Sequence, residues 1–508
     1  MARVARPNVA VSTPGRRCRR LLCIAATAAA AVAATAAVRT ATFAAPDRCP
    51  PGGGMRGLRG FGIRPAPAST SDSSLLSAAT AVAAAAGSRE DSGANADGAG
   101  SGVSGASLNL AKNLVGSGVL SLPSGVAAFS ASASALWPSL FFLAAAALLS
   151  AYGFFLIGRV CEETRSSTFA GAWRGSLRQG AWVPQLVCVL ECLGGSIIYA
   201  MVLGDVISSL LQGIVPAALA ARSTAISLVG AIVLFPLCCL RSFGQLARFS
   251  LLGTLATTYV VLFVMKRFFD GSYAPGGVFF NKAIHPVLDA VGGGGLNPNV
   301  LILVSILSTA FLVHFNAPQF YDELEPSGTP DDSKARSTKR SRFGLVGIAG
   351  FSIAAAQYAL IMVFGFLTFG RATEGNLLLN YAVSDKWAVA ARVAIGLSTL
   401  FGYPMQFAGL RSGLLEAMGF DGQLPKVKHR LLTGGLLGGV LLIACLFRDL
   451  GRFQAIEGAL LAAFLIYIAP PLMAIRLWGG RGAKVRFTSL IAVGVFLSVI
   501  GCVVTMRA

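Results

Sequence analysis

The sequence predicts an all-α, polytopic membrane protein with about eleven transmembrane helices that follow a disordered N-terminal leader. Composition is the first reason: 55% of the 508 residues are hydrophobic and only 13% are charged, a balance that water-soluble globular chains do not reach. The second reason is the recurrence of apolar runs of roughly 17 to 25 residues, the length that crosses a bilayer as a helix. The formal net charge of +20 lies in short loops between these runs, so it indicates topology and not nucleic-acid binding.

Residues 1–42 have the pattern of a signal peptide, in which four arginines between positions 16 and 20 precede an Ala-rich apolar run. Residues 43–105 are rich in Ala, Ser, Gly and Pro and predict a disordered or transit-peptide-like leader. The junction TATFAAP resembles the bipartite presequences of algae with complex plastids. That resemblance implies a plastid envelope, and the alternatives are an endomembrane or the plasma membrane.

Residues 106–508 form the predicted membrane domain. Its cationic side chains are concentrated in alternate loops, so the positive-inside rule places the start of the first span on the cytosolic side and the C-terminus opposite. The predicted spans are Leu108–Phe129, Leu136–Gly158, Val183–Leu211, Ala225–Leu240, Leu246–Met265, Asn299–Phe320, Phe343–Phe369, Ala388–Gly409, Leu431–Phe447, Ile456–Leu477 and Phe487–Met506.

The first span is interrupted by Gly116, Ser117, Gly118 and Pro123. Every backbone polar group in lipid needs a partner, so such an interruption persists only where protein buries it or where it lines a cavity. Transporters bind their substrates at interruptions of this kind. The sequence therefore favours a solute transporter, although the two glycines could instead serve only close helix packing.

Seven motifs, in order along the chain, resemble those of the amino acid/auxin permease (AAAP) family, whose members carry an amino acid transporter transmembrane domain. They are GSGVLSLP, ECLGGSIIYAMVLGD, LRSFGQLARFSLLG, FLVHFNAPQFYDELE, YALIMVFGFLTFG, NLLLNY and LFGYPMQFAGLRSGLLE. The resemblance implies a LeuT-type fold, with a five-plus-five inverted repeat plus one helix, and secondary active transport of amino acids by alternating access. We expect a monomer in the lipid bilayer that needs no cofactor and no metal.

In that fold the first and sixth spans are broken, and the positive end of a half-helix meets the substrate carboxylate. The sixth span carries its own break signal, Pro318. His314 could contact substrate, relay protons, or simply hydrogen-bond a neighbouring helix. The expected substrate site consists of Gly116, Ser117, Gly118 and Val119 from the first span and Phe311, His314 and Asn316 from the sixth.

Lys112 stands four residues before Gly116, at a position where sodium-coupled relatives carry a small polar residue. An ammonium group cannot coordinate sodium, so we expect proton-coupled or uncoupled transport. The alternative is a lysine that snorkels to the membrane surface. The residues expected around the place of the ion are Lys112, Asn113, Ser398 and Thr399.

Three charged residues, Glu191, Arg392 and Glu457, lie within or beside apolar runs. A charge there is costly unless it is paired or faces a cavity. Glu191 is the predicted proton-carrying acid, and a position at the membrane interface is the alternative for it.

Two other classes of function compete with transport. GVSG at Gly102–Gly105 resembles a serine-protease nucleophile motif, but it precedes the first span and none of the histidines His285, His314 and His429 supplies an obvious base. We therefore expect no enzyme. The alternative function is a non-transporting amino-acid sensor of the same fold.

Overall fold

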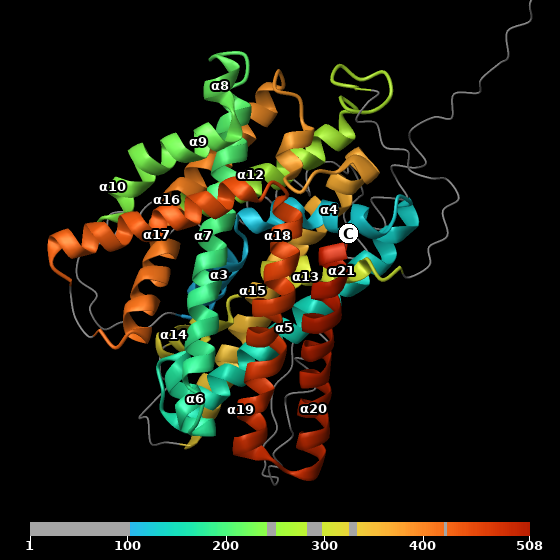
Figure 1. Ribbon diagram of the computed structural model, residues 1–508. Coiled ribbons are helices and arrows are strands. Elements are labelled where there is room, and N and C mark those ends of the chain that lie inside the picture. Colours follow the sequence, from blue (N-terminus) through green and yellow to red (C-terminus); the bar gives the residue numbers. More distant parts are fainter. Residues whose placement is uncertain (1–101, 241–249, 282–296, 325–332, 421–423, 508) are drawn as a thin grey trace, which may run out of the picture. The chain divides into compact units, whose positions relative to one another are not determined.

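The computed structural model describes residues 102–240, 250–281, 297–324, 333–420 and 424–507 (Figure 1). Nine helical segments in these ranges are long and apolar enough to cross a bilayer, and two shorter apolar helices, Gly118–Phe129 and Arg222–Cys238, match the remaining predicted spans. The prediction of an all-α polytopic membrane protein is confirmed. The predicted signal-peptide-like segment and almost all of the predicted leader lie outside the described residues.

The first five spans are formed by α3, η1 and α4; by η2 and α5; by α7; by α9, η3 and α10; and by α12. Their bounds, with those of two short helices in the connections, are α3 (Val103–Leu114), η1 (Ser117–Ser121), α4 (Leu122–Phe129), η2 (Ala133–Ala135), α5 (Leu136–Thr164), α6 (Phe169–Leu177), α7 (Trp182–Leu211), α8 (Ala217–Ala220), α9 (Arg222–Val229), η3 (Gly230–Leu234), α10 (Phe235–Cys238) and α12 (Ser250–Phe269).

The remaining spans are formed by α13, η4 and α14; by α15; by α16; by α17; by α18, η7, η8 and α19; and by α20, η9 and α21. Their bounds are α13 (Val300–Ala310), η4 (His314–Asn316), α14 (Ala317–Asp322), α15 (Ser333–Phe369), η5 (Gly370–Ala372), η6 (Leu377–Asn380), α16 (Lys386–Ala417), α17 (Lys426–Leu446), α18 (Leu450–Glu457), η7 (Gly458–Ala462), η8 (Phe464–Ile468), α19 (Ala469–Trp478), α20 (Arg481–Phe496), η9 (Leu497–Gly501) and α21 (Cys502–Arg507).

Two helix starts differ from the predicted boundaries. α3 begins at Val103, inside the segment expected to be leader, and its first turns consist mainly of small residues. α15 begins at Ser333, well before the predicted apolar run. Its polar extension is held by Arg340, whose guanidinium donates to both carboxylate oxygens of Glu162 at 2.9 and 3.0 Å.

Side-chain caps fix where several helices begin. The Asp385 carboxylate accepts from the Trp387 N–H at 3.0 Å at the start of α16, and Asp449 accepts from the Arg452 N–H at 3.0 Å at the start of α18. Short acceptor side chains at this position satisfy N–H groups that have no partner within the helix. The start of α18 is therefore well defined, which matters because this helix reaches the candidate site.

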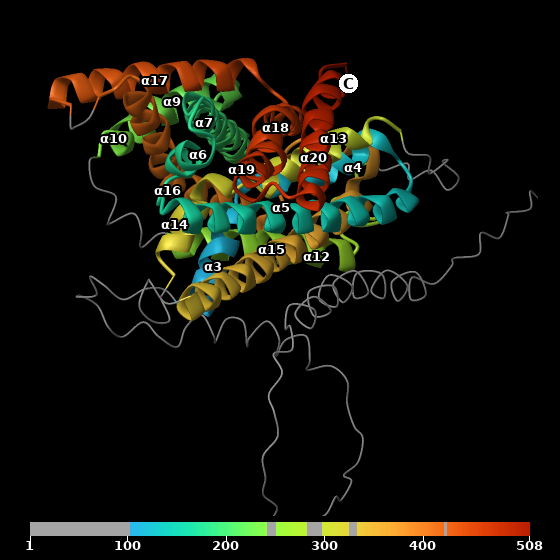
Figure 2. The ribbon, with the colours of Figure 1, turned by 90° about the horizontal axis from the view of Figure 1, so that it is seen from below.

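The first and sixth spans are both interrupted near their middles. α3 ends at Leu114 and α13 ends at Ala310, and each is followed by a short non-helical stretch and a 3₁₀ turn before the chain becomes α-helical again. α13 packs against α4 and α18, and α3 packs against α15 (Figures 1 and 2). The broken pair that the resemblance implies is therefore present.

One tyrosine connects the two breaks. The Tyr358 hydroxyl of α15 lies 2.6 Å from the Leu114 carbonyl oxygen and 2.7 Å from the Ala310 carbonyl oxygen. These are the last residues of α3 and α13, whose terminal carbonyls have no helical partner. Tyr358 is 1% exposed, and its single O–H, which donates to one of the two carbonyls at a time, lies between the two helix ends.

Candidate functional site

The break in the first span exposes the beginning of a half-helix. Gly116 has an extended backbone, with φ −114° and ψ −163°, and the 3₁₀ turn η1 begins at the next residue. The first N–H groups of a helix have no partner within it, and this end of the helix dipole is positive. The Val119 N–H already donates to the Gly116 carbonyl at 3.4 Å, so the break offers chiefly the N–H groups of Ser117 and Gly118 to a negatively charged group.

Side chains from two other spans reach this break. A methyl group at Gly118 would lie 3.2 Å from Nε2 of Gln454, and one at Gly116 would lie 3.8 Å from the Tyr199 hydroxyl. The Ser121 hydroxyl donates to Oε1 of Gln454. Gln454 is 1% exposed, and its Nε2 has no hydrogen-bond partner. A buried amide donor without a partner is unfavourable, so the Gln454 amide beside Gly118 is a donor that a ligand acceptor could satisfy.

The break in the sixth span directs His314 away from the first break. Its Nε2 donates to the Ser150 carbonyl of α5 at 2.9 Å, in space that Gly153 leaves free. The ring also makes edge-to-face contacts with Phe154 and Phe351. This geometry matches the alternative in which His314 hydrogen-bonds a neighbouring helix.

The other predicted residues of the sixth span lie close to the same break. Phe311 is fully buried, and its ring centroid lies 5.0 Å from that of Tyr358. Asn316 ends η4 and is half-buried. The structure thus brings Phe311 next to the tyrosine that joins both half-helices.

The residues expected around the ion lie on two helices, α3 and α16. Lys112 is half-buried in the last turn of α3, at the negative end of that half-helix. Asn113 is exposed and donates to the Asn109 carbonyl at 2.9 Å. Ser398 Oγ lies 3.2 Å from the position of a methyl group at Gly253 of α12, and Thr399 is buried. Within the described ranges no hydrogen bond joins Lys112 to either hydroxyl.

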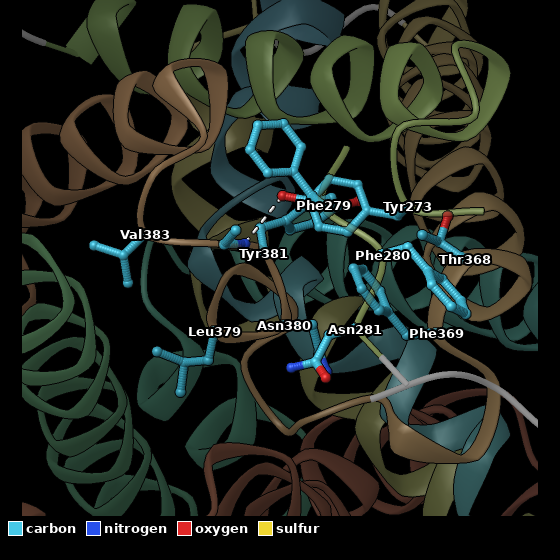
Figure 3. Close-up of a pocket in the computed structure, with 11 residues that line it drawn as sticks. Tyr273, Phe279, Phe280, Asn281, Thr368, Phe369, Leu379, Asn380, Tyr381 and Val383 are labelled. Carbon is cyan, nitrogen blue, oxygen red and sulfur yellow. Dashed lines mark hydrogen bonds between the residues drawn. The ribbon is translucent and has the colours of Figure 1, made fainter. Parts of the chain in front are cut away.

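A separate cavity of about 250 Å³ lies among the connections that follow α12 and α15 (Figure 3). None of its lining residues belongs to either break. The Tyr273 hydroxyl, on its wall, accepts from the Ala382 N–H at 3.0 Å and donates to Asp385 at 3.0 Å. This cavity is therefore part of a loop assembly and not the candidate substrate site. Its lining residues are Tyr273, Phe279, Phe280, Asn281, Thr368, Phe369, Leu379, Asn380, Tyr381, Ala382 and Val383.

Buried cations organise the same loops. Arg267 lies 2.5 Å from Asp385 and 2.8 Å from Asp270. Partial burial acts to raise the pKa of Asp270, but hydrogen bonds from Ser272, Lys266 and Arg267 lower it to about 2. Arg392, 1% exposed, donates to the Leu378 and Tyr381 carbonyls at 2.9 and 2.6 Å. The burial of Arg392 is thus explained by its hydrogen bonds to the carbonyl groups of the loop before α16.

Comparison with known proteins decides the family. Residues 99–507 match the family described as transmembrane amino acid transporter protein. The chain belongs to this family. As a member of the transmembrane amino acid transporter family it is a multi-pass membrane transport protein and not an enzyme, as the sequence predicts.

Several curated relatives have similar sequences. "Putative sodium-coupled neutral amino acid transporter 11" of Danio rerio is 24% identical over 80% of this chain and 86% of its own length. "Amino acid transporter AVT6E" of Arabidopsis thaliana is 27% identical over 80% of this chain and 83% of its own. "Vacuolar amino acid transporter 7" of Saccharomyces cerevisiae is 26% identical over 60% of this chain, but the match spans only 57% of the yeast protein.

Among solved structures, the inward-facing conformation of Mhp1 is similar to this chain, with a TM-score of 0.51 and 13% identity. The match covers 82% of this chain and 94% of that one. At this identity the likeness concerns the fold alone, and it agrees with the two broken spans. The predicted family and fold class of this transmembrane amino acid transporter are confirmed.

Sequence analysis did not identify Gln454, Tyr199 or Tyr358 as parts of the site. A signal existed for Gln454: it stands three residues before Glu457, so the two polar side chains share one face at the start of the tenth span. The tyrosines gave no such signal, since a tyrosine in an apolar run is more commonly a core residue.

Proposed function

We propose that this protein moves an amino acid across its membrane by alternating access, with transport coupled to protons or uncoupled, and not coupled to sodium. The observation that carries the proposal is the unpartnered Nε2 of Gln454 beside Gly118, within a break that presents helix N–H groups. A carboxylate accepts hydrogen bonds from both kinds of donor, and such charge-assisted bonds are the stronger ones. The names of the relatives supply the substrate class, amino acids.

In this proposal the substrate carboxylate meets the backbone N–H groups near Ser117, Gly118 and Val119 together with Gln454. Phe311 lines the neighbouring wall, and His314 acts indirectly, by holding the sixth span to α5. Glu191 serves as the proton-carrying acid. A sensor of the same fold would use the same binding site without translocation, so transport itself must be measured.

Lys112 supports the choice of ion. Its ammonium group stands in the last turn of α3, where the helix dipole attracts a cation and where a bound sodium ion would be repelled by it. The names of five relatives, the Danio rerio protein among them, include sodium coupling, so the ion needs a direct test.

Uptake of a mixture of radiolabelled amino acids into proteoliposomes is expected to respond to a proton gradient or to need no gradient, and to be indifferent to sodium. Lys112→Asn is expected to lower the initial rate about fivefold, since a cation at a helix C-terminus contributes about 1 kcal/mol. Lys386→Asn, at the exposed start of α16, is the matched control. Uptake that requires sodium contradicts the Lys112 argument, and saturable binding without uptake supports the sensor.

For the destination membrane we propose the plastid envelope, reached through the N-terminal leader as a bipartite presequence. A fusion of residues 1–105 to a fluorescent protein, expressed in an alga with complex plastids, is expected to colocalise with the plastid. Colocalisation with a vacuole, another endomembrane or the plasma membrane would contradict this proposal and support the corresponding alternative.

A further inference from the structure

Two glutamates meet inside the membrane-spanning part of the structure. Glu191 of α7 is 7% exposed, and Glu457, the last residue of α18, is 5% exposed. The Glu457 carboxyl lies so close to Gly194, one turn beyond Glu191, that a methyl group there would collide with it. The two acids interact electrostatically, and the Cys192 thiol interacts with both. They therefore form one cluster between α7 and α18, which pack against each other (Figure 1).

Within the described residues, no cation pairs with either acid. Oε2 of Glu191 and both carboxyl oxygens of Glu457 are buried without a hydrogen-bond partner. In the described segments, the acids that form ion pairs are others: Asp205, Asp270, Asp385 and Glu162.

The groups that surround the pair are neutral or acidic. On α7 these are the thiols of Cys188 and Cys192. α16 contributes Glu416, which interacts with Cys188, and the Gln406 amide, which lies against Gly195. α13 contributes the Ser305 and Thr309 groups that lie against Gly458, the residue after Glu457.

The cost of burying charge determines the protonation state of Glu191 and Glu457. An ionised carboxylate without a cation is costly in a low-dielectric interior, and two neighbouring carboxylates cannot both stay ionised. In the conformation described here the pair must therefore hold protons. It can release one only when a change of conformation brings water or a cation to it.

α18 connects this pair to the substrate site. Gln454 lies three residues before Glu457, on the same face of the helix. The Gln454 side chain accepts a hydrogen bond from the Ser121 hydroxyl of the first span. The Gln454 backbone carbonyl accepts a hydrogen bond from the Thr309 hydroxyl of the sixth span at 2.9 Å. The π-helical turn η7 begins directly after Glu457, and such turns occur frequently at functional sites. One helical turn thus touches both broken spans and the acid pair.

We propose that Glu191 and Glu457 form a single proton-binding site whose protonation is transmitted through α18 to the substrate site. This inference rests on the proposed function and adds a second acid and a route to it. A proton from water on one side binds a carboxylate oxygen of the pair, which becomes a neutral acid. The same oxygen returns the proton to water on the other side after the conformational change, so no other reactant is needed.

The test compares the wild-type protein with Glu457→Gln, Glu191→Gln and the double variant in proteoliposomes, with Glu163→Gln on the exposed end of α5 as the matched control. Two rates are measured with a mixture of radiolabelled amino acids: net uptake under an imposed proton gradient, and exchange at equal pH on both sides. Each single variant is expected to lose at least tenfold in gradient-driven uptake while it keeps exchange. The double variant is expected to lose no more than the singles, since the pair acts as one site.

The outcomes separate the two proposals. If wild-type uptake ignores the proton gradient, proton coupling fails and the inference fails with it. If a proton gradient drives uptake equally well in the wild type and in Glu457→Gln, the proton site at Glu191 and Glu457 is overturned and the proposed function stands. If a glutamine variant loses exchange as well, Glu457→Asp decides: restored gradient-driven uptake supports the proton site, and failure to restore it overturns the inference.

Discussion

Gly458→Ala is expected to abolish transport and to destabilise the protein strongly. A methyl group at this position would collide with the backbone carbonyl of Ser305 and with the Thr309 hydroxyl. Both belong to α13, the first half of the broken sixth span, which is itself packed between α4 and α18. Overpacking costs about 1–3 kcal/mol when side chains can yield, and here a backbone would have to move. We therefore expect at least the upper end of that range.

Thermal unfolding of the purified protein in detergent, followed by tryptophan fluorescence, measures this effect, and uptake in proteoliposomes measures its consequence. Gly438→Ala in α17 is the matched control, since a methyl group there meets nothing within 4 Å. The control is expected to unfold at the wild-type temperature or slightly above it. Equal unfolding temperatures for Gly458→Ala and Gly438→Ala would show that α13 and η7 are less tightly packed than the structure indicates.

The sequence predicts the membrane fold well because two strong local signals determine it. Lipid requires long apolar runs for every span, and it penalises any interruption that has no structural use. The break at Gly116 and Gly118 was visible for this reason, as was the break marked by Pro318. Helix ends outside the hydrocarbon carry no such constraint, so the sequence did not predict the polar start of α15, which depends on the pairing of Arg340 with Glu162.

The composition of the site was less predictable because it depends on contacts between distant segments. Ser121 and Gln454 are 333 residues apart in sequence, and no local period relates them. His314 is a second example, because the sequence identified the residue but not its orientation. Its polarity within an apolar run marked it correctly as unusual, but its orientation is set by the space at Gly153 and by the Ser150 carbonyl on another helix.

The interaction partners of the buried charged residues are a third feature that could not be predicted from the sequence. Glu191, Arg392 and Glu457 were all visible as charges within or beside apolar runs. Arg392 proves to bind loop carbonyls, while the two glutamates prove to lie close enough to interact electrostatically. The packing of α7 on α18 brings the two glutamates together. The sequence alone does not show that they are neighbours, or that Arg392 has a structural role.

Gln454→Glu is expected to remove most substrate recognition and to lower stability, because it places a carboxyl group at a buried position one turn from Glu457. The new carboxylate has nearly the same shape, still accepts from the Ser121 hydroxyl, and leaves the backbone bond from Thr309 unchanged. It lacks the Nε2 donor beside Gly118, however, and in its ionised form it repels a substrate carboxylate. Because a hydrogen bond to a charged group contributes about 1.5–3 kcal/mol, the apparent affinity for labelled amino acids is expected to fall by roughly 10- to 100-fold.

Concentration-dependent uptake by Gln454→Glu, Gln454→Leu and the wild type separates a loss of affinity from a loss of maximal rate. Gln319→Glu, on the exposed face of α14, controls for an added negative charge. Since Gln454→Leu removes the donor without adding charge, it is expected to lie between the wild type and Gln454→Glu. If Gln454→Glu keeps wild-type affinity, the substrate carboxylate does not bind beside Gly118, and the site must then be sought on the other side of the broken pair, near Phe311 and Tyr358.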